Sequence, residues 1–244
     1  MRIPRVFVDL PLTEDSTHIL PDASFHYLCN VLRLKEGHPL ILFNGLGGQY
    51  EANLANISKK TAEVSVHTHM QVLNESPIKI TLGQSLSRGE RMDYAIQKAV
   101  ECGIHSIQPL YSERCEVKLN DARIEKRVKH WQQIAISAAE QCGRCVVPIV
   151  QKPIALCDWV QNCNEMLKLT LHHHVQATLS QLQCPTSNTI AILIGPEGGL
   201  TEEEVKTSLN QGFTAIQLGP RVLRTETAAV VATTAINLLW GDIR

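Results

Sequence analysis

Two passages near the carboxyl end decide the fold of this chain: TIAILIGPEGG at Thr189–Gly199 and AIQLGPRVLRTETA at Ala215–Ala228. Each begins with a short apolar run rich in β-branched residues, which predicts a buried strand. Each then passes through glycine into a helical pattern. An open α/β sheet binds its ligand at the carboxyl ends of its strands, in turns of this kind. The two passages therefore predict ligand-binding loops.

The ligand expected in these loops is a nucleoside without phosphate. The Gly-x-Gly-x-x-Gly fingerprint of dinucleotide sites is absent from the sequence, which disfavours a dinucleotide-dependent enzyme. Thr201 and Glu204 form a capping box, so a helix begins just after Gly199. The glutamates at Glu202–Glu204 oppose any anion at this helix N-terminus. A cationic ligand suits the site, and S-adenosylmethionine, an adenosine that carries a sulfonium, fits this description.

Both loops resemble the cofactor motifs of the SPOUT methyltransferases, with IGPEGGL at Ile194–Leu200 and LGPRVLRTETA at Leu218–Ala228. More narrowly, they resemble the RsmE family of bacterial enzymes, which methylate N3 of a uridine in 16S ribosomal RNA. Other segments that match this family are Ser87–Met92, Gln97–Ile104, Ser112–Cys115 and Glu140–Arg144. The resemblance spans nearly the whole chain. It implies an S-adenosylmethionine-dependent rRNA (uracil-N3) methyltransferase whose partner is 16S ribosomal RNA or the small ribosomal subunit.

Composition is that of an ordinary globular protein, with 244 residues, 44% of them hydrophobic and 19% charged. The sequence has no apolar run near the length of a membrane span, and no signal-type apolar region follows its start. Its eight cysteines are scattered, which is typical of reduced, buried thiols. We therefore expect a cytoplasmic protein without a membrane partner. Cys142 and Cys145 form a lone C-x-x-C pair with no second pair at zinc spacing, so no metal is expected.

The segment Asn74–Pro77 reads as a linker between two domains. Residues 1–72 show short strand patterns and one helical pattern at Phe25–Leu34. The strand patterns lie at Arg5–Val8, Pro39–Phe43, Gln49–Leu54 and Thr61–Val66. The resemblance implies that this domain is a PUA-like RNA-binding β-barrel.

Residues 73–244 alternate strand and helix, which predicts an α/β fold with a mostly parallel sheet flanked by helices. Strands are expected at Ile78–Leu86, Ser106–Tyr111, Val146–Val150, Met166–His172, Ile190–Ile194 and Ala215–Leu218. Helices are expected at Arg91–Cys102, Ala122–Gln141, Leu156–Cys163, Glu202–Asn210 and Thr225–Trp240. The resemblance implies a SPOUT methyltransferase domain with a trefoil knot.

The last expected helix, Thr225–Trp240, is apolar on almost every face from Ala228 to Trp240. Its polar breaks are Thr233, Thr234 and Asn237. A helix that is apolar all round must be buried on all sides. The resemblance implies that this helix threads the knot and packs against a second subunit, so we expect a homodimer.

The resemblance also implies a set of cofactor-binding residues. They are Leu171, Ile194, Gly195, Pro196, Gly199, Leu218, Gly219, Leu223 and Arg224. Most of them would act through backbone groups, and the glycines allow close approach.

The chemistry of uridine predicts the type of catalytic group. Neutral uracil is a poor nucleophile at N3, so a catalyst must stabilise an anion that spreads onto the flanking carbonyl oxygens. Preorganised cationic donors do this best. The resemblance implies the catalytic candidates: Arg144 and Arg224 are the arginines within the family's motifs at predicted helix ends, with Glu226 to orient an arginine or accept the proton. Arg144 could instead cap the end of a helix, and the neighbouring Arg221 could replace either arginine.

RNA contacts are expected from the distribution of charge rather than from the net charge of −1. Residues 79–152 hold 12 Lys and Arg against 8 Asp and Glu. The candidate RNA-binding residues are Arg5, Arg33, Arg88, Arg123, Lys126 and Arg127. A solvated helix face is an equal alternative for the basic cluster, and Arg33 is either a phosphate contact or a solvated charge.

Two other hypotheses remain open for the function. One is a related SPOUT RNA methyltransferase with a different target nucleotide, and the other is a non-catalytic PUA-like RNA-binding protein. The run His172–His174 does not predict a metal site, because adjacent strand residues point to opposite faces.

Overall fold

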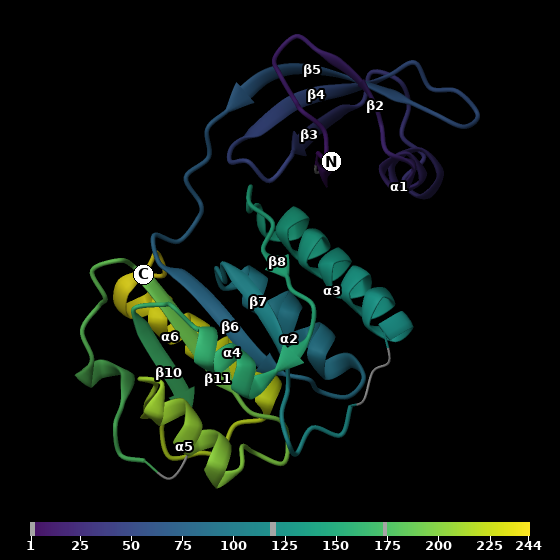
Figure 1. The fold of residues 1–244 in the computed structure, drawn as a ribbon. Helices are drawn as coiled ribbons and strands as arrows, with labels where there is room; N and C mark the ends of the chain where they lie inside the picture. Colours follow the sequence, from purple (N-terminus) through teal and green to yellow (C-terminus); the bar gives the residue numbers. More distant parts are fainter. Residues whose placement is uncertain (1–2, 118–120, 173–174) are drawn as a thin grey trace. The chain divides into compact units, whose positions relative to one another are not determined.

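The computed structural model describes residues 3–117, 121–172 and 175–244, which form two compact units (Figure 1). The first unit comprises Met1–Glu75 and Ala139–Val147. The second comprises Ser76–Ala138 and Pro148–Arg244. The first unit thus includes a short segment from far along the chain. The predicted domain division between residues 72 and 73 stays a prediction.

A curled five-stranded sheet in the order β1-β3-β4-β5-β2 forms the first unit. Its strands are β1 (Arg5–Phe7), β2 (Thr17–Ile19), β3 (Pro39–Phe43), β4 (Gln49–Ala55) and β5 (Glu63–Met70). Strands β1 and β3 are parallel, and the other neighbours are antiparallel. Four of these strands were predicted. Strand β2 was not, because it is three residues long and its apolar residue, Ile19, is exposed.

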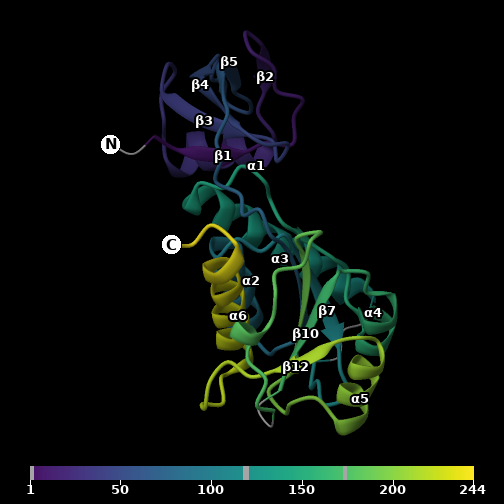
Figure 2. The same cartoon turned by 90° about the vertical axis from the view of Figure 1, so that its left-hand side faces the viewer.

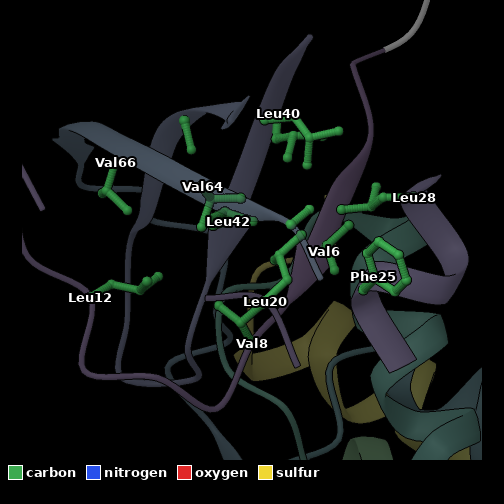
Figure 3. Close-up of a cluster of buried hydrophobic side chains, with 13 residues drawn as sticks. Val6, Val8, Leu12, Leu20, Phe25, Leu28, Leu40, Leu42, Val64 and Val66 are labelled. Atoms are coloured by element: carbon green, nitrogen blue, oxygen red, sulfur yellow. The ribbon is translucent and has the colours of Figure 1, made fainter. Parts of the chain in front are cut away.

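The core of the first unit lies on the inner face of this sheet (Figure 3). Val6, Leu42 and Val64 contribute from β1, β3 and β5, and each is at most 2% exposed. Leu28 and Phe25 close the core from the helical segment. The alternation of apolar and polar residues along the strands places one apolar set inward, as the sequence predicted.

The predicted helix Phe25–Leu34 is wrong in type and bounds. The chain instead forms a four-residue helix α1 (Asp22–Phe25) and a π-helix η1 (His26–Val31). The wider π-turn keeps Leu28 in the core while Tyr27, Val31 and Leu32 are exposed, so the apolar residues do not share one buried face. Arg33 follows in the left-handed region, at φ 54°.

The second unit contains one parallel sheet in the order β12-β10-β11-β6-β7-β8, with β9 also paired to β7. Its strands are β6 (Lys79–Ser85), β7 (Ser106–Tyr111), β8 (Ile149–Val150), β9 (Ile154–Ala155), β10 (Leu167–Leu171), β11 (Thr189–Ile194) and β12 (Thr214–Ile216). The predicted parallel sheet is confirmed. Strand β9 was missed, since two residues carry no periodic signal.

Helices cover both faces of this sheet (Figure 2). They are α2 (Glu90–Glu101), α3 (Asp121–Cys142), α4 (Leu156–Asn162), α5 (Glu202–Asn210) and α6 (Thr225–Trp240), with a short 3₁₀ helix η2 (Leu179–Gln181). Helices α2 and α6 pack together on one face, and α4 and α5 pack together on the other. The predicted capping box of α5 is confirmed, because Thr201 and Glu204 exchange hydrogen bonds of 2.8 and 3.2 Å.

Close packing between β6 and α4 explains a glycine in a central strand. A Cβ atom at Gly83 would lie 2.4 Å from the ring of Trp159. That ring belongs to a core cluster with Leu193 and Phe213. The absence of a side chain at Gly83 therefore lets α4 approach the sheet.

Within one chain, helix α6 is buried on one face, so the expectation of burial on all sides, which includes packing against a second subunit, stays a prediction. Ala228, Ala229, Ala232 and Ile236 face the interior, whereas Leu238 and Leu239 are 59% and 47% exposed. The polar breaks are accommodated internally: Asn237 donates to the carbonyl of Cys102 and accepts from Ser76, and Thr233 donates to Ala229. The trefoil knot stays a prediction. No helix in the described part of the chain is long and apolar enough to cross a membrane.

Candidate functional site

A cavity of about 730 Å³ opens at the carboxyl ends of β10, β11 and β12. The last residues of these strands, Leu171, Ile194 and Ile216, all line it. Its walls are the loop 195–200 after β11 and the loop 217–224 that leads into α6. This is the edge where a parallel sheet is expected to bind its ligand, and the volume falls within the range of small-molecule sites.

Glycines allow the two loops to form the cavity wall. A Cβ atom at Gly195 would lie 2.9 Å from the Cγ of Leu200, so this position has no room for a side chain. Gly199 and Gly219 adopt φ angles of 71° and 97°, which residues with a Cβ rarely adopt. Backbone groups of the loops are therefore accessible to a ligand without intervening side chains.

The structure brings together the whole predicted cofactor set. All nine residues line the cavity: Leu171, Ile194, Gly195, Pro196, Gly199, Leu218, Gly219, Leu223 and Arg224. Two predicted catalytic residues, Arg224 and Glu226, line it as well. These residues come from three separate strand-to-loop passages, and parallel packing of the strands is what makes them neighbours.

Four arginines line the cavity, and they differ in how they are held. Arg91 pairs with Glu197 at 2.9 Å, and Arg114 donates to the carbonyl of Gly198 at 3.0 Å. Both therefore brace the loop after β11. Arg221 and Arg224 are exposed, and within the described residues the guanidinium of neither makes a hydrogen bond or an ion pair. The second pair of arginines is thus available to a substrate.

Glu226 is one of three glutamates that line the cavity, with Glu197 and Glu202. It lies in the first turn of α6, and its Oε2 atom is buried without a hydrogen-bond partner among the described residues. A buried carboxylate oxygen without a donor is costly, so such an atom is suited to a cationic or hydrogen-bond-donating ligand group.

Arg144 lies in the first unit and is not among the residues that line the cavity. Its side chain is 7% exposed, and its Nε and Nη2 atoms donate to Glu75 Oε2 at 2.9 and 2.6 Å. The other oxygen of Glu75 accepts from the backbone of Cys145 and Val146. The alternative of helix capping stays a prediction beside this ion pair. The catalytic role of Arg144 stays a prediction.

Arg5 also has structural partners in the first unit. Its guanidinium donates to the carbonyls of Ala139 and Arg144 at 2.9 and 2.7 Å and lies 3.9 Å from the ring of Phe43. The nearby carboxyl of Glu140 accepts from the backbone of Phe7 at 2.9 Å. Burial raises the pKa of Glu140, although the Phe7 hydrogen bond and the charge of Arg5 act in the opposite direction.

The remaining candidate RNA contacts are exposed. Arg123, Lys126 and Arg127 lie along α3, and Arg88 pairs with Glu116 at 2.9 Å. Arg88 and Arg127 line one smaller cavity of about 290 Å³ together with Trp131. Two contacts predicted from separate segments thus lie side by side, whereas Arg33 is exposed in the first unit.

Metal-ligating side chains do not gather in the described residues, where no group of three His, Cys, Asp or Glu could hold an ion. His173 and His174 lie outside the described residues, so the reading of the His172–His174 run stays a prediction. Cys142 and Cys145 are both free thiols.

Sequence reasoning missed several residues of the cavity wall. Arg91, Arg114 and Thr225 line the cavity and come from the start of α2, the loop after β7 and the start of α6. Arg91 and Arg114 lie within motifs that were recognised, but nothing in a linear motif shows which cavity its side chains face.

Comparisons with known proteins agree with this geometry. Residues 74–237 match the family described as RNA methyltransferase domain, and residues 20–66 match the RNA methyltransferase PUA domain. The protein named ribosomal RNA small subunit methyltransferase E from Buchnera aphidicola is 36% identical over 100% of this chain and 96% of its own length. Its namesake from Bacillus subtilis is 31% identical, over 98% and 99%.

Two solved structures are similar over their full length. Ribosomal RNA small subunit methyltransferase E from Neisseria gonorrhoeae, bound to S-adenosylmethionine, superposes with a TM-score of 0.93 at 39% identity and covers 100% of both chains. A proposed methyltransferase from Legionella pneumophila, in complex with the same cofactor, gives a TM-score of 0.96 at 36% identity, also over 100% of both chains.

Proposed function

Because this chain belongs to the ribosomal RNA small subunit methyltransferase E family, we propose that it transfers a methyl group from S-adenosylmethionine to N3 of a uridine in 16S ribosomal RNA. Cofactor and RNA follow from the family. The choice of uridine N3 follows from the resemblance of the loop motifs. The proposal places the protein in the cytoplasm with its substrate, the small ribosomal subunit or its RNA.

The observation that carries the proposal is the composition of the large cavity. All nine residues expected to contact the cofactor line it, and Gly199 and Gly219 present backbone at positive φ. The orphaned carboxylate oxygen of Glu226 suits the cationic groups of the cofactor. The acidic first turn of α5, at Glu202–Glu204, is poorly suited to a phosphate. S-adenosylmethionine therefore fits the residues present.

In this proposal each part of the cavity has one task. The loops after β11 and β12 hold the cofactor through backbone groups. When bound, S-adenosylmethionine supplies an electrophilic methyl group. Arg224, helped by Arg221, stabilises the negative charge that develops on the uracil oxygens as N3 loses its proton. Glu226 orients a cationic group, because a carboxylate would need a strongly raised pKa to act as the base.

The exposed basic residues have a role in holding RNA. Arg123, Lys126 and Arg127 form a stripe along α3, and Arg88 lines the smaller cavity together with Arg127. Contacts of this kind with the phosphate backbone would position the RNA without reading its sequence. Arg33 and Arg5 of the first unit complete the proposed RNA-binding set.

A homodimer is part of the same proposal. The outer face of α6 carries Leu238 and Leu239, which are 59% and 47% exposed, on a helix that is apolar over most of its length. An apolar helix face that one chain leaves exposed suits a second copy, and two-fold pairing is the commonest closed arrangement.

The test is to map modified nucleosides in 16S ribosomal RNA from cells with and without this protein. Digestion and mass spectrometry would compare the RNA at each methylated uridine. We expect N3-methyluridine at one position to disappear without the protein and to return when the gene is restored. Undiminished N3-methyluridine in the cells that lack the protein would contradict the proposal, and loss of a different methylated nucleoside would favour another target.

A further inference from the structure

Two buried polar side chains outside the predicted cofactor set join the two loops of the large cavity. Gln84, at the end of β6, is 1% exposed, and its Nε2 atom donates to Thr225 Oγ1 at 2.8 Å. Thr225 Oγ1 donates in turn to the carbonyl oxygen of Gly195 at 2.8 Å. The hydroxyl therefore acts as a relay, accepting from a strand and donating to a loop.

The relay reaches both loops at residues that line the cavity. Gly195 begins the loop after β11, and Thr225 lies between Arg224 and Glu226 at the start of α6. The Gly195 backbone already packs tightly, since a Cβ there would lie 3.1 Å from the backbone nitrogen of Leu200. The hydrogen bond from Thr225 to the Gly195 carbonyl thus fixes the distance between the loop after β11 and the start of α6.

The sheet itself does not require a glutamine at position 84. Strand β6 lies between β11 and β7, and its backbone is paired with both neighbours. A polar side chain in such an interior is costly unless it is hydrogen-bonded. Gln108 on β7 shows the purely structural case: it is 9% exposed, and its Nε2 donates to the carbonyls of Pro109 and Lys152, which do not line the cavity.

We propose that Gln84 and Thr225 are positioning residues of the methyltransferase, holding the Gly195 loop and the first turn of α6 in the arrangement that binds the cofactor. The inference rests on the proposed function. Without the relay, each loop would sample other positions, and only part of the molecules would be competent to bind. The apparent dissociation constant for the cofactor rises in proportion to the fraction lost.

Thr225 offers a sharp test with a control on the same helix. Thr225→Val keeps the shape and removes the hydroxyl, whereas Thr225→Ser keeps the hydroxyl. Thr233→Val is the matched control, because Thr233 is buried in α6 and its hydroxyl donates to Ala229. By calorimetry we expect Thr225→Val to weaken S-adenosylmethionine binding by about tenfold, which corresponds to roughly one buried hydrogen bond. Thr225→Ser and Thr233→Val should stay within about twofold of the wild type.

Gln84 is tested in the same way against Gln108. Gln84→Met should weaken cofactor binding by about three- to tenfold, and Gln108→Met should leave it near the wild-type value although both lose a buried amide. Single-turnover methylation distinguishes positioning from chemistry. At saturating cofactor and RNA, Gln84→Met and Thr225→Val should recover to within about threefold of the wild-type rate, because the loss lies in binding.

Each outcome decides the inference. Equal weakening in Gln84→Met and Gln108→Met, or in Thr225→Val and Thr233→Val, would mean general destabilisation and would overturn it. Unchanged affinity in Thr225→Val would overturn it as well. If Thr225→Val does not fold, the comparison of Gln84→Met with Gln108→Met tests the inference. A wild-type protein that binds no S-adenosylmethionine would instead overturn the proposed function, and the inference with it.

Discussion

Arg224 places a positive charge at the N-terminal end of helix α6, where a positive charge does not stabilise a helix. It occupies the N-cap of α6, is exposed, and lines the large cavity. A positive charge there opposes the helix dipole, so its position is better explained by a substrate. We predict that Arg224→Ala slows methyl transfer by on the order of a hundredfold and weakens cofactor binding far less, because the charge it stabilises exists only in the transition state.

Single-turnover methylation of small-subunit RNA at saturating enzyme and cofactor measures this effect. The control is Lys126→Ala, which removes an exposed cation of α3 from outside the cavity. Removing a residue that only contacts phosphate should weaken RNA binding and make the affinity for RNA depend less on salt concentration. A full rate in Arg224→Ala once RNA is saturating would show that the arginine only holds RNA.

Arg144 has the contacts of a residue that stabilises the first unit. Its guanidinium is nearly buried against Glu75, whose other oxygen accepts two backbone hydrogen bonds. We predict that Arg144→Ala lowers the free energy of unfolding by about 2 kcal/mol, below the usual range for a buried pair because Glu75 is partly exposed. Urea unfolding measures it, with Glu75→Gln as the variant that keeps hydrogen-bonding groups. Unchanged stability together with a lost rate at saturating RNA would contradict this and support the predicted catalytic role of Arg144.

Glu140 should make the stability of the protein depend on pH. Burial raises its pKa from the ordinary value of 4.5, so the folded state favours the neutral carboxyl. Its contribution is present below the unfolded pKa and is lost as pH rises through the higher folded pKa. We predict that the wild type loses stability relative to Glu140→Gln as pH rises from about 4. Urea unfolding at a series of pH values tests this, and a constant difference would contradict it.

The sequence predicted which residues line the large cavity where those residues belong to contiguous motifs. The cofactor loops are contiguous motifs, so their residues could be assigned before the fold was known. Glu75 is far from Arg144 in sequence, and only the folded first unit shows their pairing. Gln84 did carry a signal, since a glutamine at the end of an apolar strand must find a partner. Which partner it finds depends on the packing of β6 against the start of α6.

Among the elements, α6 is the helix whose exposed face would form the contact in the proposed homodimer. Leu238 and Leu239 are exposed on a helix whose other face is buried in the second unit. We predict that Leu238→Glu combined with Leu239→Glu converts a dimer into a monomer, because two charges would have to be buried in the contact. Analytical ultracentrifugation at micromolar concentration measures the change. Leu209→Glu on α5 is the control, since Leu209 is similarly exposed, at 46%.

A wild type that sediments as a stable monomer would contradict the proposed homodimer. So would a double variant that dimerises as the wild type does.

Long periodic elements could be predicted, whereas strands β2 and β9 and the π-helix η1 could not. Helices α5 and α6 have the expected bounds, because a capping box marks α5 and α6 is strongly apolar. Strands β2 and β9 are three and two residues long and depend on pairing with distant strands. The π-helix η1 places Leu28 in the core of the first unit, and local spacing does not distinguish such a π-helix from an α-helix.

For the whole molecule, the alternation of strand and helix predicted the parallel sheet, and the sheet placed the loops at one edge. The order of the strands was not predictable, because β10 lies between β11 and β12 although it precedes both in the chain. That order is what brings Leu171 beside the loops after β11 and β12. The segment Ala139–Val147 belongs to the first unit, which no local pattern indicates.

The most direct test of the central claim is transfer of an isotopically labelled methyl group from S-adenosylmethionine to small ribosomal subunits, comparing Gly199→Val with Gly212→Val. Both glycines have positive φ and open surroundings, at 71° and 83°, but only Gly199 lines the cavity. Backbone strain from valine is therefore similar in the two variants, and only Gly199→Val places a side chain in the cavity. We expect the wild type and Gly212→Val to place the label on N3 of a uridine, and Gly199→Val to bind no cofactor and transfer none. Normal transfer by a folded Gly199→Val, or label on a different base, would contradict the account.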